Sequence, residues 1–221
     1  MLAVDMPFHG KTSWQEGLEF SPQQLLEILA QIIGPAWDRP IRICLLGYSM
    51  GGRIGLALLP LMAARVERII LLAPDGLTLS PWYWLATQTR PGNLLFRYTM
   101  RHPAWFFRML QIAHRMGLVN LSIQKFVNIY IGDKVLRENL YLRWTVMRHF
   151  RPDLRRIKSL IRQQHIRVKL LYGIYDRIIR PERGEAFGQG IENLCELLRI
   201  ESGHQLLHAK QLQIILQWLK D

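Results

Sequence analysis

Residues 45–52, LLGYSMGG, decide the fold class of this chain. They place Ser49 in the pattern G-x-S-x-G, between an apolar run at 41–46 and a helical pattern that extends to about residue 64. Glycines on both sides of a serine allow a sharp strand-to-helix turn that exposes the hydroxyl at the end of a sheet. The alternative is an ordinary serine in a glycine-rich turn. The flanking strand and helix patterns favour a nucleophile at Ser49.

Apolar runs of strand length alternate with helical patterns on both sides of this turn. A first helix is expected to start at Ser21 and Pro22, a hydroxyl cap followed by proline, and to end before Gly34. The run at 41–46 is apolar apart from Arg42, which predicts a strand buried on both faces. The alternation predicts an α/β fold with a mostly parallel sheet and helices on both faces. The expected strands are 2–5, 41–46, 68–73, 166–172 and 195–200, and the last helices are expected near 182–189 and 206–219.

The sheet pattern stops between residues 77 and 164, where the sequence is helical, irregular and rich in tryptophan and arginine. An interruption of this kind is typical of a helical cap inserted into an α/β core. We therefore expect a core formed by residues 1–76 and 165–221, incomplete at its N-terminal side, and a helical cap formed by residues 77–164.

The formal net charge of +12 comes from this same segment. Residues 77–164 hold 15 of the 29 Lys and Arg but only 3 of the 17 Asp and Glu. Aromatic walls and arginines suit a lipophilic or anionic small-molecule substrate, although most of these arginines are expected on a solvated helix face. The run at 101–110, RHPAWFFRML, also suits a membrane surface, but packing of its aromatic side chains is the favoured interpretation. No nucleic-acid motif is present, so no nucleic-acid partner is expected.

The remaining composition indicates a cytoplasmic protein without a cofactor. The N-terminus has no basic stretch followed by a long apolar run, so it does not read as a signal peptide. Cys44 and Cys195 lie in strand-like runs and are expected to be buried thiols rather than a disulfide. No cluster of Cys and His has the spacing of metal ligands, so neither a metal nor another cofactor is expected.

Four stretches of the chain resemble the α/β-hydrolase fold superfamily, of the serine hydrolase type. The stretch VDMPFHGKT (4–12) is similar to the family's loop after its fourth strand, and LLGYSMGGR (45–53) is similar to its nucleophile elbow. LLYGIYDRIIRP (170–181) and ESGHQLL (201–207) are similar to the strand end that carries the acid and to the loop that carries the histidine. They follow the order Ser, Asp, His that this fold requires.

The resemblance implies that Ser49 is the nucleophile, Asp176 the orienting acid and His204 the general base. Asp75, at the end of the preceding strand, is the rival acid. His208 is the rival base and is expected inside the last helix.

The resemblance also implies further site residues. The backbone N–H of Met50 is expected to supply half of the oxyanion hole. Tyr48, His9 and Arg53 are the expected substrate-binding residues.

The chain departs from the family pattern at its start. Phe8 stands where glycine is usual and Thr12 where serine is usual. The family's first three strands precede the motif that here begins at residue 2, so these strands and the second oxyanion donor are expected to be missing. We favour a fragment of a longer hydrolase. A homodimer or another chain that covers the free sheet edge, and a reduced, weakly active relative, are the alternatives.

The expected function is hydrolysis of a carboxylic ester or related acyl substrate through a Ser-His-Asp triad. GYSMGGR, with an arginine after the elbow, also resembles the menaquinone-pathway synthases, which use the same triad to eliminate pyruvate from a polycarboxylate. The third alternative is an inactive or weakly active binding module whose basic segment contacts an anionic partner.

Overall fold

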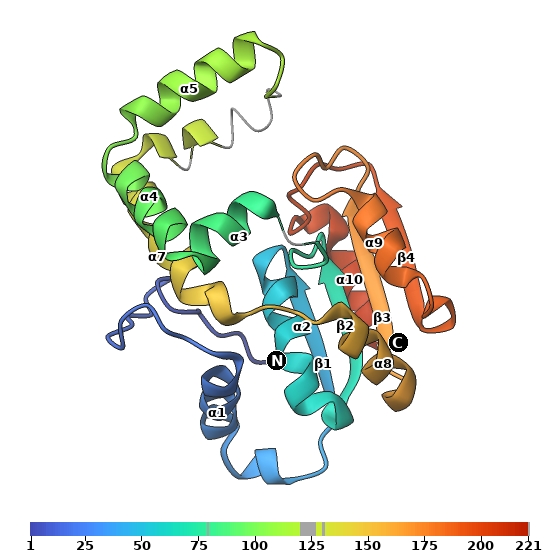
Figure 1. The fold of residues 1–221 in the computed structure, drawn as a ribbon. Helices are drawn as coiled ribbons and strands as arrows, with labels where there is room; N and C mark the ends of the chain where they lie inside the picture. The colour runs from blue at the N-terminus through green and yellow to red at the C-terminus, as the bar shows by residue number, and fades with distance from the viewer. Residues whose placement is uncertain (79, 120–126, 130, 221) are drawn as a thin grey trace. The chain divides into compact units, whose positions relative to one another are not determined.

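A parallel sheet of four strands organises the computed structural model, which describes residues 1–78, 80–119, 127–129 and 131–220 (Figure 1). Its strands follow one another in chain order, β1-β2-β3-β4, and each pairs in parallel with the next. This confirms the expected α/β class. The strands are β1 (Ile43–Tyr48), β2 (Val66–Leu72), β3 (Arg167–Gly173) and β4 (Cys195–Ile200).

Helices precede, connect and follow these strands along the chain, with short 3₁₀ turns at several of their ends. The described α-helices are α1 (Pro22–Ile33), α2 (Met50–Met62), α3 (Pro81–Gln88), α4 (Arg90–Arg101), α5 (Ala104–Arg115), α7 (Lys134–Val146), α8 (Leu154–Gln164), α9 (Pro181–Gly188) and α10 (Ala209–Lys220). Among these described residues, no helix is long and apolar enough to cross a membrane.

The chain separates into two compact units. One, which we call the helical unit, consists of Met1–Phe20 and Leu79–His149; the other, the sheet unit, consists of Ser21–Thr78 and Phe150–Asp221. The helical unit holds α3, α4, α5 and α7, and the sheet unit holds all four strands. The division into a core of 1–76 and 165–221 and a cap of 77–164 stays a prediction.

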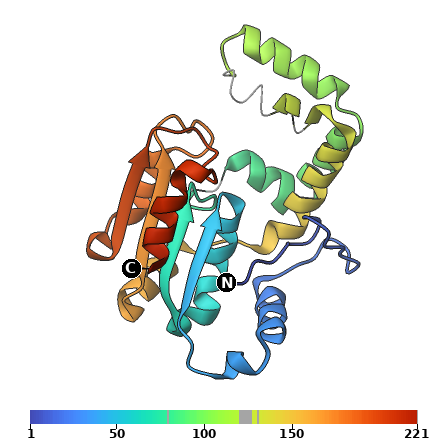
Figure 2. The same ribbon diagram turned by 180° about the vertical axis from the view of Figure 1, so that it is seen from behind.

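Helices cover both faces of the sheet, as the sequence predicts. Helix α10 lies on one face, and α2, α8 and α9 lie on the other (Figures 1 and 2). Strand β2 is almost wholly buried between these layers. Its one buried cation, Arg68, faces α10, where its Nη1 donates a hydrogen bond to the Trp218 carbonyl at 2.6 Å. That bond ties the last helix to the middle of the sheet.

Strand β1 corrects the expectation of a strand buried on both faces. It pairs with β2 on one side only, and its residues are mostly half-buried, with Leu46 44% exposed. A strand at the edge of a sheet lacks the neighbour that would cover it, so an apolar sequence alone does not bury it. The predicted strand at 2–5 is also wrong: these residues have no strand assignment, since no described strand pairs with them.

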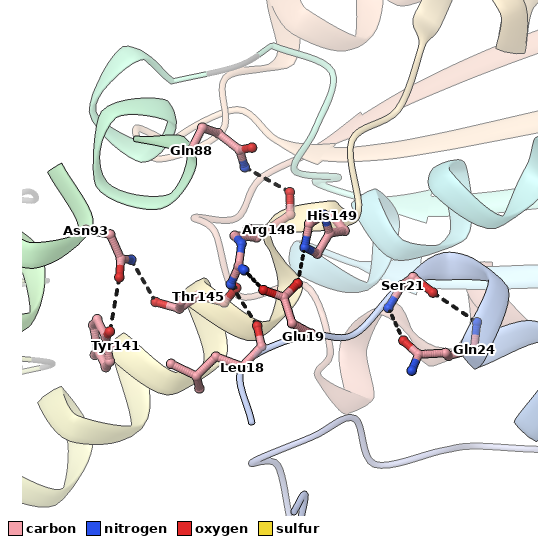
Figure 3. Close-up of polar contacts among 10 residues, drawn as sticks. All are labelled: Leu18, Glu19, Ser21, Gln24, Gln88, Asn93, Tyr141, Thr145, Arg148 and His149. Atoms are coloured by element: carbon pink, nitrogen blue, oxygen red, sulfur yellow. Dashed lines mark hydrogen bonds and ion pairs between the residues drawn. The ribbon is translucent and has the colours of Figure 1, made fainter. Parts of the chain in front are cut away.

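The first helix of the sheet unit starts where the sequence predicts. The Ser21 hydroxyl accepts a hydrogen bond from the Gln24 amide, and the Gln24 side chain accepts one from the Ser21 amide (Figure 3). This reciprocal pair satisfies two amides at the helix start, and Pro22 follows at the first helical position. The helix ends at Gly34, whose φ of 62° suits glycine.

The helical unit is held together by a polar cluster and an apolar cluster. Glu19 forms an ion pair with Arg148, its other carboxylate oxygen lies 2.5 Å from Nε2 of His149, and Arg148 also donates to the Leu18 carbonyl at 2.7 Å (Figure 3). These contacts fasten residues 18–19 to the turn after α7. Away from them lies a core of Met100, Leu110, Val127 and Ile131, with Phe96, Phe106, Phe107, Val119, Leu140 and Tyr141 packed around it.

The two cysteines are free thiols, as expected, but both are half-buried rather than buried. Cys44 lies on β1 and Cys195 on β4, which are the outermost strands of the sheet. Partial burial raises the pKa of Cys44, and it raises the pKa of Cys195 to about 11. Since the thiolate is the reactive form, both cysteines are poor nucleophiles at neutral pH.

Candidate active site

Ser49 occupies a strained turn between β1 and α2. Its φ of 48° and ψ of −114° are unfavourable for a side chain with a Cβ atom. Hydrogen bonds to the end of β2 stabilise this conformation: the Ser49 amide donates to Leu72 at 2.9 Å, and the Ser49 carbonyl accepts from the Asp75 amide at 2.8 Å. Backbone strain of this kind persists where surrounding bonds hold it and is concentrated at functional sites.

Two of the glycines around Ser49 are required by close contacts. A Cβ atom at Gly47 would lie 2.6 Å from the Gly51 carbonyl oxygen, and a Cβ atom at Gly52 would lie 2.5 Å from the Cβ of Pro74. Gly51 is different, because a Cβ atom there would meet nothing within 4 Å. Close packing of α2 therefore requires glycine at position 52 and not at position 51.

We expect Gly52→Ala to destabilise the chain and Gly51→Ala to leave it intact. The extra methyl at Gly52 forces α2 away from Pro74, at a cost of about 1–3 kcal/mol. The methyl at Gly51 points into open space and gains about 0.5–1 kcal/mol of helix propensity. Urea unfolding of the two variants measures the difference, and equal midpoints would contradict the contact at Gly52.

The acid of the site lies in the loop after β3. The Asp176 side chain is fully buried, and its Oδ1 accepts hydrogen bonds from the amides of Ile178 at 2.8 Å and Ile179 at 2.9 Å. Its Oδ2 lies 2.7 Å from Nδ1 of His204. Amide donors to a buried carboxylate stabilise its charged form and fix its orientation. Asp176 is thus held with one oxygen facing the histidine.

The rival acid is engaged elsewhere. Asp75 lies 3.5 Å from the Arg53 guanidinium, and its other oxygen accepts a hydrogen bond from the Gly76 amide at 2.7 Å. Of the two carboxylates that the sequence offered, the structure therefore brings Asp176 and not Asp75 to His204.

His204 connects the acid to the serine. Its Nε2 lies 3.1 Å from Oγ of Ser49, and its Nδ1 faces Asp176. A carboxylate can only accept, so Nδ1 carries the proton and donates a hydrogen bond to Asp176. The lone pair of Nε2 is then free to accept the Ser49 hydroxyl proton. The three side chains form one continuous hydrogen-bonded chain within the sheet unit.

Backbone contacts bring the loops of this chain together. The Tyr175 amide donates to the Ser202 carbonyl at 3.0 Å, so the acid loop is bonded to the histidine loop. A Cβ atom at Gly173 would lie 2.3 Å from the carbonyl oxygens of Ser202 and Gly203. Only glycine permits this close contact. The contact holds in place the backbone directly before His204.

His208 lies apart from this arrangement. It precedes α10 rather than lying within it, and it is exposed. The predicted helix start at 206 is therefore too early. Leu206 is instead buried in the loop before α10, which starts at Ala209.

Tyr48 contacts the loop that carries His204. Its hydroxyl donates to the His204 carbonyl at 3.1 Å, and the two rings are 5.5 Å apart. The residue before the nucleophile thus holds the loop that carries the base. The sequence singled out Tyr48 for substrate binding, and that role stays a prediction. The two residues are 156 positions apart in the sequence, so no local pattern could predict this hydrogen bond.

The other expected substrate-binding residues lie in different surroundings. Arg53 is buried on α2 and pairs with Asp75, so its charge is compensated inside the sheet unit. His9 belongs to the helical unit, and its Nδ1 donates to the Pro7 carbonyl at 3.0 Å. Burial, above all, lowers the pKa of His9, which favours the neutral form of the ring.

Phe8, beside His9, has a φ of 63°. This left-handed conformation explains why glycine is usual at that position in the family. The Phe8 carbonyl accepts a hydrogen bond from Nε of Arg143 at 2.7 Å, which holds the residue in place.

Met50 is the first residue of α2, directly after Ser49. The first amides of a helix have no partner within the helix, and they favour negative charge. The Met50 amide is therefore suited to the oxyanion role that the sequence assigned. Among the described residues, no group of three or more His, Cys, Asp or Glu is arranged to hold a metal ion.

The sequence matches the model of the alpha/beta hydrolase family over residues 1–211, and the chain belongs to this family. No curated protein matches the sequence. Similar solved structures are a probable hydrolytic enzyme from Pseudomonas aeruginosa PAO1 (20% identity, TM-score 0.63) and an esterase from Thermogutta terrifontis (21%, 0.61). An enol-lactonase from Burkholderia xenovorans LB400 is also similar (16%, 0.58).

These structures share the fold along most of their length. The matches cover 98%, 96% and 97% of this chain, and 75%, 76% and 78% of the three proteins in the same order. At such identities the likeness establishes the fold alone, and the chemistry has to be argued from the side chains of this chain.

Proposed function

We propose that this chain is a serine hydrolase that cleaves a carboxylic ester or a related acyl substrate. The observation that carries the proposal is the hydrogen-bonded chain from Asp176 through His204 to Ser49, at the carboxyl ends of the parallel strands. Ligands of open α/β sheets bind at this edge. Family membership and the esterase among the similar structures support the same class of reaction.

In this proposal each group carries out one step. Nε2 of His204 accepts the Ser49 proton as Oγ attacks the substrate carbonyl, and the imidazolium that forms is stabilised by Asp176. The Met50 amide donates to the oxyanion, a contact typically worth about 3 kcal/mol in such sites. His204 then returns its proton to the leaving alcohol, and water releases the acyl group from Ser49 by the same route.

A fluorophosphonate probe tests this proposal, because it reacts only with an activated serine. We expect the full chain to be labelled at Ser49, as read by intact mass, and we expect Ser49→Ala to remain unlabelled. Chain unfolded in urea is the control for nonspecific reaction. Absence of labelling, or equal labelling of Ser49→Ala, would remove the hydrolase proposal and favour a binding module.

The pyruvate-eliminating synthase would use the same three side chains, so probe labelling does not exclude it. The synthase alternative rests on the arginine after the elbow, Arg53. The structure weakens it, because the Arg53 guanidinium is buried beside Asp75. Turnover of short and long p-nitrophenyl esters, compared with a succinyl-type polycarboxylate, separates the two reactions. We expect ester cleavage; elimination of pyruvate without ester cleavage would favour the synthase.

A further inference from the structure

Helix α5 of the helical unit carries two apolar faces, and only one of them is needed for packing. Leu110 is buried in the core of the helical unit, with Phe106 and Phe107 packed around it. The opposite face presents Trp105, Met109 and Ile112, and Met116 follows directly after the helix; we call these four residues the outer stripe. Among the described residues, none of the four belongs to that core, and only the Trp105 ring touches its edge, 5.9 Å from the ring of Phe106 between centroids.

The outer stripe is exposed and continuous along the helix. Its four side chains are 36%, 49%, 58% and 68% exposed in chain order. They recur at intervals of four, three and four residues, which places them on one side of an α-helix. Burying large apolar side chains is favourable, so a stripe of this length left in water marks an interaction surface.

The charge beside the stripe indicates the kind of partner. Arg108 and Arg115 are exposed and, at helical spacing, flank the stripe on one side. Residues 77–132 contain six Lys or Arg and no Asp or Glu, so neither arginine has an acidic neighbour on its own helix. An apolar stripe bordered by arginines, with a tryptophan among its members, matches helices that lie in the headgroup region of anionic membranes.

We propose that the outer stripe of α5 docks the chain on an anionic lipid surface. Trp105, Met109, Ile112 and Met116 enter the acyl boundary, and Arg108 and Arg115 contact the lipid phosphates. The docking is peripheral and does not rest on the catalytic proposal.

Co-sedimentation of the full chain with vesicles tests this inference. We expect binding to phosphatidylcholine vesicles that contain phosphatidylglycerol, and weaker binding at high salt because salt screens the arginines. Arg108→Gln with Arg115→Gln should weaken binding by about 25-fold, since each basic residue contributes about fivefold at an anionic surface. Met109→Ser with Ile112→Ser should weaken it by about tenfold or more.

Matched variants in the sheet unit serve as controls. Leu212→Ser with Leu216→Ser removes two exposed apolar side chains from α10, and Arg155→Gln with Arg156→Gln removes two exposed charges from α8. Both controls should bind as the parent chain does.

Three results would overturn the proposal: no binding to anionic vesicles, equal binding to phosphatidylcholine alone, or equal losses in the control variants. Light scattering tests whether a second copy of the chain binds the outer stripe instead. A dimer of the parent chain that Met109→Ser with Ile112→Ser converts to a monomer would assign the stripe to a second copy instead.

Discussion

Replacing His204 by alanine is expected to lower kcat for ester hydrolysis by about 10⁴-fold or more, because its imidazole links Asp176 to Ser49 by two hydrogen bonds. Without the imidazole, no group receives the hydroxyl proton, and Ser49 stays a weak nucleophile. The measurement is kcat with a p-nitrophenyl ester, together with the rate of fluorophosphonate labelling.

His208→Ala is the matched control for this experiment. It removes the same side chain from an exposed position before α10, so kcat should change by no more than about twofold. Equal losses in the two variants would refute His204 as the base. A loss confined to His208→Ala would exchange the two assignments.

Replacing Asp176 by asparagine is expected to lower kcat by about 10⁴-fold while the chain stays folded. The reason lies in the two amides of Ile178 and Ile179, which both donate to Oδ1. They hold the carbonyl oxygen of an asparagine in that place and turn its NH₂ group toward Nδ1 of His204. The ring must then accept at Nδ1 and carry its proton on Nε2, where it cannot take the proton of Ser49.

Asp75→Asn distinguishes this effect from a general loss of acidic charge. Asp75 pairs with Arg53 and does not contact His204, so its variant should lose stability more than turnover. Near-ultraviolet circular dichroism confirms that both variants are folded. If Asp75→Asn lowers kcat as far as Asp176→Asn does, the orienting role belongs to Asp75 or is shared.

Much of the fold could be predicted from local patterns. The cap of α1, the buried strand β2, and the glycines on both sides of Ser49 leave signals within a few residues. The exposure of β1 could not be predicted in this way, because it depends on which strands lie beside it and not on its own apolar residues. The start of α10 was misjudged because Leu206 fits a buried loop as well as a first helical turn.

The same distinction between local patterns and long-range contacts applies to the candidate site. The sequence alone determined Ser49, the order Ser, Asp, His, and two candidates each for the acid and the base, because these signals are local. Only the tertiary structure decided that Asp176 rather than Asp75 faces His204, that Tyr48 braces the histidine loop, and that Arg53 is compensated. These are contacts between strand ends far apart in the chain, and the parallel sheet creates them by aligning its carboxyl ends.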